Sequence, residues 1–216
     1  MNARPGSIRA LAACGLLCAA VSVGAAPAAA HRGDASAGGA KADGERCIEC
    51  HVPRDAVTAQ PGDGLHALLD GQSVSYLAKQ MSDYRSGARE HPVMTLISRN
   101  LDDGDLADIL AWYAAKPWRA GDGASADAAA QRLYTEGDPA RAIVACATCH
   151  GAPGQPPAPA DMPRIAGQDA AYLAAQLQRW RSGERSNSVG GLMTVSARRL
   201  TDVEIQALAT HIAAMK

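Results

Sequence analysis

Four cysteines and two histidines form two copies of one five-residue pattern, at 47–51 and 146–150. Each copy has two cysteines three positions apart, followed at once by histidine. Two thiols about one helical turn apart can add to the two vinyl groups on one haem edge, and the histidine then reaches the iron. A single copy would also suit a zinc site or a redox dithiol. The pair of copies predicts two covalent haem c groups on Cys47, Cys50, Cys146 and Cys149, with His51 and His150 as iron ligands.

Two methionines are candidates for the iron ligand on the opposite face of each haem. Met94 and Met193 each follow the histidine of their pattern by the same spacing, and we expect both in a loop before a final helix. Methionine is ordinarily core filler, but the paired spacing favours ligation. His91 is a rival ligand in the first half. A thioether favours Fe(II) and fills the site that peroxide would need, so the spacing predicts electron transfer and not substrate chemistry.

The remaining methionines and histidines of the chain after residue 30 carry no predicted role in the site. Met81 belongs to a helical packing stripe, because its repeat mate is Leu177. Met162 and Met215 have no repeat mate. His66 and His211 suit surface or core positions.

The two patterns belong to an internal repeat. Residues 69–87 match residues 165–183. The cysteine patterns and the last helices also match, but their two copies lie three residues further apart along the chain. Each half therefore carries a compensating loop change. The repeat predicts a first domain at 31–119, a linker at 120–123 and a second domain at 124–216.

Both halves show helical periodicity and predict an all-α fold of two tandem domains. The apolar stripes are Leu77, Met81 and Tyr84; Leu173, Leu177 and Trp180; Leu106, Ile109, Leu110 and Tyr113; and Ile205, Leu208 and Ile212. We expect Asp102 and Thr201 to cap the last helix of each half, and each cysteine pair to close a first helix. The proline-rich stretch 150–165 predicts an irregular loop.

Composition narrows the function further. Apolar residues make up 47% and charged residues 20% of the chain, which excludes a disordered protein. The formal net charge of -1 leaves no basic excess for nucleic acid. Charge is uneven: residues 31–120 hold ten Lys or Arg against thirteen Asp or Glu, and residues 121–216 hold nine against nine. The extra negative charge should stabilise Fe(III) and lower the potential of the first haem.

The first thirty residues have the pattern of a signal peptide. Arg4 and Arg9 precede a soft apolar stretch, and small residues suited to cleavage follow around 26–30. No later run of apolar residues is long enough to span a membrane. We therefore expect a periplasmic protein, with peripheral membrane association as an option.

The chain resembles the tandem dihaem cytochromes c of the cytochrome c4 family, over nearly all of residues 31–216. The matching features are the two cysteine patterns, Gly167–Leu177, Arg181–Gly183, Met193 and Leu200–Ile205. The resemblance implies two class I cytochrome c folds that face each other and pass electrons toward a terminal oxidase. It also implies redox partner proteins such as an oxidase, a bc1-type complex or a dehydrogenase.

The resemblance implies a second contact for each haem histidine. In class I cytochromes c a proline carbonyl about a dozen residues on accepts from the histidine ring, and Pro163 fits this role for His150. The aligned residue of the first half is Ala67. That half also departs from the family in Val52 and in its loop at 61–64.

Three functions compete on this basis. The leading one is a periplasmic electron carrier without a substrate site. The second is the cytochrome subunit of a flavoprotein or quinoprotein dehydrogenase. The third, a dihaem peroxidase, would need a haem with an open or displaceable ligand.

Overall fold

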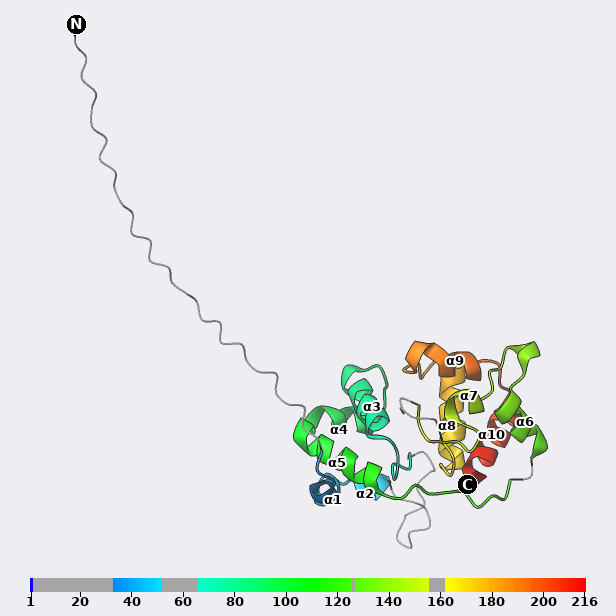
Figure 1. The fold of residues 1–216 in the computed structure, drawn as a ribbon, viewed down its shortest axis with the longest axis horizontal. Coiled ribbons are helices and arrows are strands. Elements are labelled where there is room, and N and C mark those ends of the chain that lie inside the picture. The colour runs from blue at the N-terminus through cyan, green and yellow to red at the C-terminus, as the bar shows by residue number, and fades with distance from the viewer. Residues whose placement is uncertain (2–32, 52–65, 126, 156–161) are drawn as a thin grey trace. The chain divides into compact units, whose positions relative to one another are not determined.

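Two matching series of helices make up the computed structural model of the chain (Figure 1). The structure describes residue 1 and residues 33–51, 66–125, 127–155 and 162–216. These ranges contain no strand, only an isolated bridge between Asp138 and Ile143. No helix in them has both the length and the apolar character needed to cross a membrane. The predicted all-α class is confirmed.

The helices of the two series correspond one to one. The first series is α1 (Ala35–Gly44), α2 (Cys47–Cys50), α3 (Val74–Ser86), α4 (Pro92–Asn100) and α5 (Asp103–Ala115). The second is α6 (Ala128–Glu136), the 3-10 turn η1 (Pro139–Arg141), α7 (Ala147–His150), α8 (Ala170–Ser182), the 3-10 turn η2 (Val189–Gly191), α9 (Leu192–Ala197) and α10 (Asp202–Ala214).

The cysteine pairs do not close the first helices, so this expectation was wrong. In the first half Arg46 has a φ of 60°, and this left-handed residue separates α1 from the one-turn helix α2. In the second half η1 and the bridge at Asp138 lie between α6 and α7. Each cysteine pair therefore has a short helix of its own.

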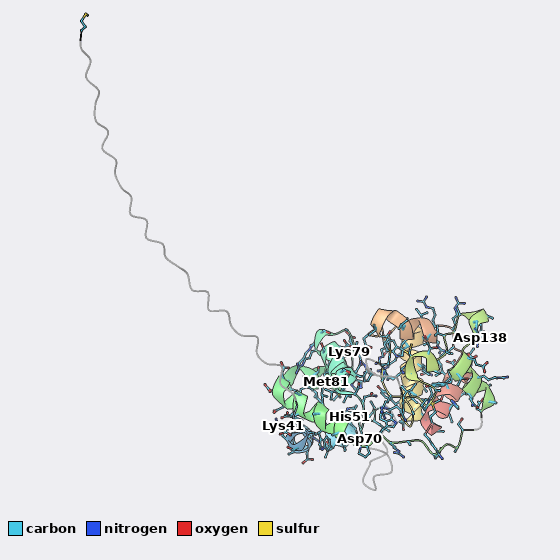
Figure 2. The ribbon with its side chains drawn as sticks, viewed as in Figure 1. Lys41, His51, Asp70, Lys79, Met81 and Asp138 are labelled. Atoms are coloured by element: carbon cyan, nitrogen blue, oxygen red, sulfur yellow. The ribbon has the colours of Figure 1, made fainter. Side chains whose placement is uncertain are left out.

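Each series surrounds its own apolar core, and the predicted stripes form both. The first core contains Ala42, Leu77, Met81, Tyr84, Leu101, Ile109, Leu110 and Tyr113. The second contains Tyr134, Ile143, Leu173, Ala174, Trp180, Ala197, Leu200, Ile205, Leu208, Ala209 and Ile212. Met81 is buried, as its stripe position predicts (Figure 2). Burial of an aliphatic or aromatic side chain contributes about 1.5–3 kcal/mol, so these stripes are the main force that docks the helices.

Local signals set the ends of the helices around each core. The Asp102 carboxylate accepts from Gly104 N and Asp105 N at the start of α5. Thr201 and Glu204 form a reciprocal capping box at the start of α10. These residues are the predicted N-terminal caps.

The chain between the halves lies against the second half. Gly121 N and Gly123 N donate to the carbonyls of Met215 and Ala214 at the end of α10, at 2.6 and 2.7 Å. A Cβ on Gly167 would lie 2.1 Å from Arg119 O, so only glycine allows this approach. The predicted linker is thus tied to the end of the chain. The domain boundaries themselves stay a prediction.

Candidate functional site

The two cysteines of each pair are separated by one helical turn, and a histidine follows at the end of that turn. His51 N donates to Cys47 O, and His150 N donates to Cys146 O, both at 3.0 Å. The thiols are free of disulfide bonds. Burial raises the pKa of Cys146 to about 11. A reactive dithiol needs a lowered thiol pKa, so this environment suits covalent attachment to a carbon ligand better than thiol exchange.

A backbone carbonyl fixes each of the two histidine rings. His51 Nδ1 lies 2.8 Å from Ala67 O, and His150 Nδ1 lies 3.0 Å from Pro163 O. A carbonyl can only accept, so Nδ1 carries the proton and the lone pair is on Nε2. Burial also lowers the pKa of both histidines. A neutral imidazole with a fixed ring and a free Nε2 is the form that ligates a metal.

Both acceptors agree with the predicted second contacts. Pro163 occupies the expected position in the second half. The Ala67 carbonyl serves in the same way in the first half, although the side chain differs. The contact depends on the path of the backbone and not on the residue type.

A cavity lined by residues of both halves brings together the site residues that were predicted for the second half. Cys146, Cys149, His150, Pro163 and Met193 all contribute to its wall. The rest of the wall in this half is mainly apolar and includes Leu133, Ile143, Leu173, Leu177, Trp180, Leu200, Leu208 and Ile212. An apolar cavity with two thiols, a fixed imidazole and a thioether fits a large flat iron cofactor.

The candidate methionines lie in helices and not in loops, so this part of the prediction was wrong. Met94 is in the first turn of α4, and Met193 is in the first turn of α9. Met94 N donates to His91 Nδ1, and Met193 N donates to Ser188 Oγ. His91 therefore caps α4, whereas α9 follows Gly191 and is held by Ser188, and the sequence pattern alone identified neither contact.

An arginine holds each methionine helix against the helix that precedes it. Arg85 at the end of α3 donates to the carbonyls of Ser98 and Leu101. Arg181 at the end of α8 donates to the carbonyl of Leu200. The Arg-Ser-Gly motif of the repeat thus braces the segment that carries the candidate ligand.

His91 has a structural role at the helix that carries Met94. Its Nδ1 accepts from Met94 N at the start of α4. His91 is also close enough to His51 to lower the pKa of that histidine, after the larger effect of burial. The assignment of Met94 rather than His91 as the ligand of the first half stays a prediction.

The other predicted non-ligands fall where expected, with one addition. His66 packs edge-on against the His51 ring at 6.3 Å, and His211 lies 5.9 Å from the Tyr134 ring. Met215 packs against the second core. Met162 lines the same cavity as Met193. Its lack of a repeat mate did not suggest this position.

Four buried side-chain polar atoms lack a hydrogen-bond partner within the described residues, and two of them are ring-borne donors that fit a carboxylate-bearing cofactor. They are Tyr113 Oη on α5 and Trp118 Nε1 beside the linker. Trp118 shares a small cavity with His51. A buried unpaired donor is costly, and the carboxylates of a haem are acceptors of the kind that these donors need.

A buried polar cluster joins the two halves, and the sequence did not reveal it. Arg89 donates to Tyr172 Oη and to Gln176 Oε1, both at 3.1 Å. Arg185, its repeat mate, donates to Gln80 Oε1 at 3.1 Å. The matched positions of these arginines in the repeat are the signal that could have found them.

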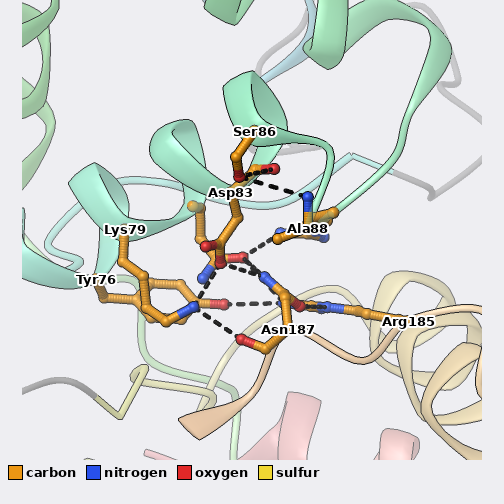
Figure 3. Close-up of polar contacts among 9 residues, drawn as sticks. Tyr76, Lys79, Asp83, Ser86, Ala88, Arg185 and Asn187 are labelled. Carbon is orange, nitrogen blue, oxygen red and sulfur yellow. Dashed lines mark hydrogen bonds and ion pairs between the residues drawn. The ribbon is translucent and has the colours of Figure 1, made fainter.

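A lysine extends this cluster, as Figure 3 shows. Lys79 Nζ donates to Asn187 O at 2.7 Å and pairs with Asp83. Asn187 Nδ2 also donates to Asp83. These contacts join α3 to the segment ahead of α9.

Some predicted features lie outside the described residues. They are the signal peptide at 1–30 with its cleavage site, Val52, the loop at 61–64 and the central part of the proline-rich loop. The described residues 151–155 and 162–165 of that loop form no helix or strand.

Comparisons with known proteins agree with this site. The cytochrome c family model matches residues 128–216. Cytochrome c4 from Thiocapsa roseopersicina is 35% identical over 191 residues, which cover 86% of this chain and 94% of that protein. The thiosulfate dehydrogenase electron acceptor of Stutzerimonas stutzeri is 36% identical over 180 residues, with 82% of each chain covered.

A solved structure extends the similarity to the fold. The crystal structure of reduced recombinant cytochrome c4 from Pseudomonas stutzeri matches with a TM-score of 0.73 and 30% sequence identity. The match covers 85% of this chain and all of that one.

Proposed function

The chain belongs to the cytochrome c4 family, and on this premise we propose that it is a periplasmic carrier that relays single electrons toward a terminal oxidase. The protein is a dihaem electron-transfer cytochrome with covalently bound haem c. Cys47 and Cys50 would hold one haem, and Cys146 and Cys149 the other. The iron ligands would be His51 with Met94 and His150 with Met193.

The observation that supports this proposal is the cavity that contains the predicted site residues of the second half. Cys146, Cys149, His150 and Met193 all line this mainly apolar space, and His150 Nδ1 lies 3.0 Å from Pro163 O. The bound iron supplies a reversible one-electron couple between Fe(III) and Fe(II). His150 would supply a neutral imidazole to this iron, Met193 would supply a thioether, and the mainly apolar wall would keep water from it.

Haem stoichiometry tests the attachment sites. Pyridine haemochrome analysis should give two haems per chain, and both should remain after acid-acetone extraction. Cys149→Ala should leave one thioether bond on the second haem and shift only that haem's pyridine spectrum. Extractable haem, or bound zinc in its place, would refute the assignment of the cysteines.

A second candidate function is that of electron acceptor for a periplasmic dehydrogenase. The specific observation in its favour is the similarity to the thiosulfate dehydrogenase electron acceptor of Stutzerimonas stutzeri. Both functions use the same two haems and differ in the protein that docks. The sequence identity does not separate them.

Stopped-flow mixing separates the two candidates. The oxidised protein is mixed with a thiosulfate dehydrogenase and its substrate, and the reduced protein with a terminal oxidase. Fast, salt-dependent reduction in the first mixture together with slow oxidation in the second would favour the acceptor role. Peroxide turnover by the pure protein would contradict both candidates and point to an enzyme.

A further inference from the structure

Two glutamines reach from one half of the molecule to the backbone of the other. Gln168 Nε2 donates to Leu68 O at 3.0 Å, and Gln168 Oε1 accepts from Leu68 N at 2.9 Å. Gln72 makes the same pair of bonds with Arg164, at 3.0 and 3.1 Å. The two glutamines are repeat mates, and both are at most 5% exposed.

The residues that they grip lie next to the acceptors of the haem histidines. Leu68 directly follows Ala67, whose carbonyl accepts from His51 Nδ1. Arg164 directly follows Pro163, whose carbonyl accepts from His150 Nδ1. Two bonds to a single residue restrict both rotation and translation of its peptide groups, and the peptide group of Ala67 or Pro163 includes the gripped nitrogen.

Each glutamine is in turn fixed to its own half. Gln168 Oε1 also accepts from Asp169 N at 3.0 Å, and the preceding Gly167 N donates to Ile212 O on α10. Gln72 Oε1 also accepts from Ser73 N, and Gly71 N donates to Tyr113 O on α5. Hydrogen bonds, joined by single steps along the backbone, thus link the last helix of one half to the histidine of the other.

We infer that Gln168 is a positioning residue for His51, and Gln72 a positioning residue for His150, so each half orients the iron ligand of the other. The inference rests on the proposed function, because it takes both histidines as iron ligands. The acceptor of a ligand's second ring nitrogen sets ring orientation and ligand basicity. A change in either should appear in the properties of the haem opposite the substituted residue.

The test uses the complete dihaem protein with Gln168→Met, which keeps the side-chain length and removes both bonds. The haem methyl signals in the NMR spectrum are assigned through contacts with Cys47 and Cys50, or with Cys146 and Cys149, so the assignment needs no axial-ligand data. Gln168→Met should shift the first haem's signals and change its reduction equilibrium about threefold, which is less than the 10–100-fold typical of a direct contact. Gln72→Met should do the same to the second haem.

A matched control separates positioning from a general loosening between the halves. Gln80 is also buried and also bonds across the halves, to Arg185 and Asn187, but within the described residues none of its hydrogen bonds goes to 67–68 or 163–164. Gln80→Met should leave the histidine-sensitive signals of both haems unchanged. If it reproduces the effect of Gln168→Met, or if Gln168→Met shifts the second haem instead, the inference is wrong.

A second variant keeps the test decisive if Gln168→Met does not assemble. The shorter amide of Gln168→Asn can keep at most one of the two bonds, and it should still shift the first haem alone. A protein with two assigned haems and no shift in either variant refutes the inference and leaves the proposed function intact. A protein without two covalent haems refutes the proposed function itself.

Discussion

In both halves a backbone carbonyl accepts from the histidine ring, but the number of residues between the histidine and its acceptor differs. The bond spans 16 residues in the first half, from His51 to Ala67, and 13 residues in the second, from His150 to Pro163. The three extra residues account for the shift in register between the repeats. A backbone carbonyl is available at every residue, so the fold can keep an acceptor in place while the loop and the side chain change.

The halves also differ in the ion pairs that join their first and last helical segments. In the first half Lys41 on α1 pairs with Asp105 and with the buried Asp108 on α5. In the second half Arg141 pairs with Asp138 and Glu204. In the first half, Lys41 thus joins α1 to two carboxylates of α5. In the second half, Arg141 joins η1 to Glu204 of the α10 capping box.

Removal of the candidate thioether ligands should give the largest effect and tests whether the halves use the same ligand. Met94→Ala and Met193→Ala should each weaken the long-wavelength charge-transfer band of the ferric protein. The potential of one haem should fall in each variant, because the soft sulfur that favours Fe(II) is lost. Visible spectroscopy and potentiometric titration measure both.

His91→Ala is the control for the first half. It removes the cap of α4, which should cost about 1 kcal/mol of stability, and it should leave the charge-transfer band in place. A loss of the band in His91→Ala but not in Met94→Ala would make His91 the ligand and the two halves chemically different.

The unequal charge of the halves should give two distinct potentials, with the first haem lower. A unit charge about 10 Å away contributes roughly 1.7 kcal/mol at an effective dielectric near 20, before screening. A separation of tens of millivolts is therefore expected, and it should narrow as salt rises. Potentiometric titration at two ionic strengths measures it, with the methionine variants to assign each wave. A single wave, or a higher first potential, would show that charge does not control the difference.

Pro163→Ala should make the second half resemble the first. Loss of proline stiffness raises the entropy of the unfolded chain and should destabilise the second half by about 0.4–1 kcal/mol. The carbonyl remains, so the contact with His150 should persist with a broader ring orientation. Thermal unfolding and the haem methyl shifts report the two effects.

Pro153→Ala makes the same chemical change in the turn after His150 and away from its acceptor. It should lower stability by a similar amount and leave the methyl shifts of the second haem unchanged. Equal methyl shifts in the two variants would mean that Pro163 has no particular role in holding the histidine.

The smallest expected effect concerns acid. Arg141 lowers the pKa of Glu204 from 4.5 to about 2. Because the pKa is lower in the folded state, the stabilisation is present above about pH 4.5 and is lost as the pH falls toward 2. Glu204→Gln should lower the stability at neutral pH. The stability of this variant should also fall less steeply between about pH 4.5 and 2, which acid titration followed by circular dichroism can measure.

Glu184→Gln is the matched control, because Glu184 pairs with Arg179 at the exposed surface. Exposed pairs contribute little, so this variant should follow the parent curve. An acid profile of Glu204→Gln that also follows the parent would remove the Arg141 pair as a source of difference between the halves.

The sequence predicted the features that depend on local pattern. The apolar stripes and the caps at Asp102 and Thr201 follow from spacing within one half. The contact of each histidine with a downstream carbonyl was implied by the resemblance to class I cytochromes c. The helices at Met94 and Met193 were missed because each is short. A run of so few residues carries too little periodicity to distinguish a helix from a loop.

The contacts between the halves could not be predicted in the same way. Gln72 and Gln168 stood out only as repeat markers, and Arg89 and Arg185 did not stand out at all. A polar residue that bonds across a buried boundary has the same local sequence as one that faces water. Only the three-dimensional meeting of α3 and α8 distinguishes the two cases.

The ties between the linker and the last helix bear on how a molecule of this kind can arise and be rebuilt. Gly121 and Gly123, at the start of the second half, bond to Ala214 and Met215 at its end. When the first and last residues of a domain are adjacent, two copies of the domain can be joined in tandem by a very short linker. Neither copy then has to change its fold. The same adjacency makes the second half a candidate for circular permutation, with new ends opened in a surface turn and the old ones joined across residues 121–123.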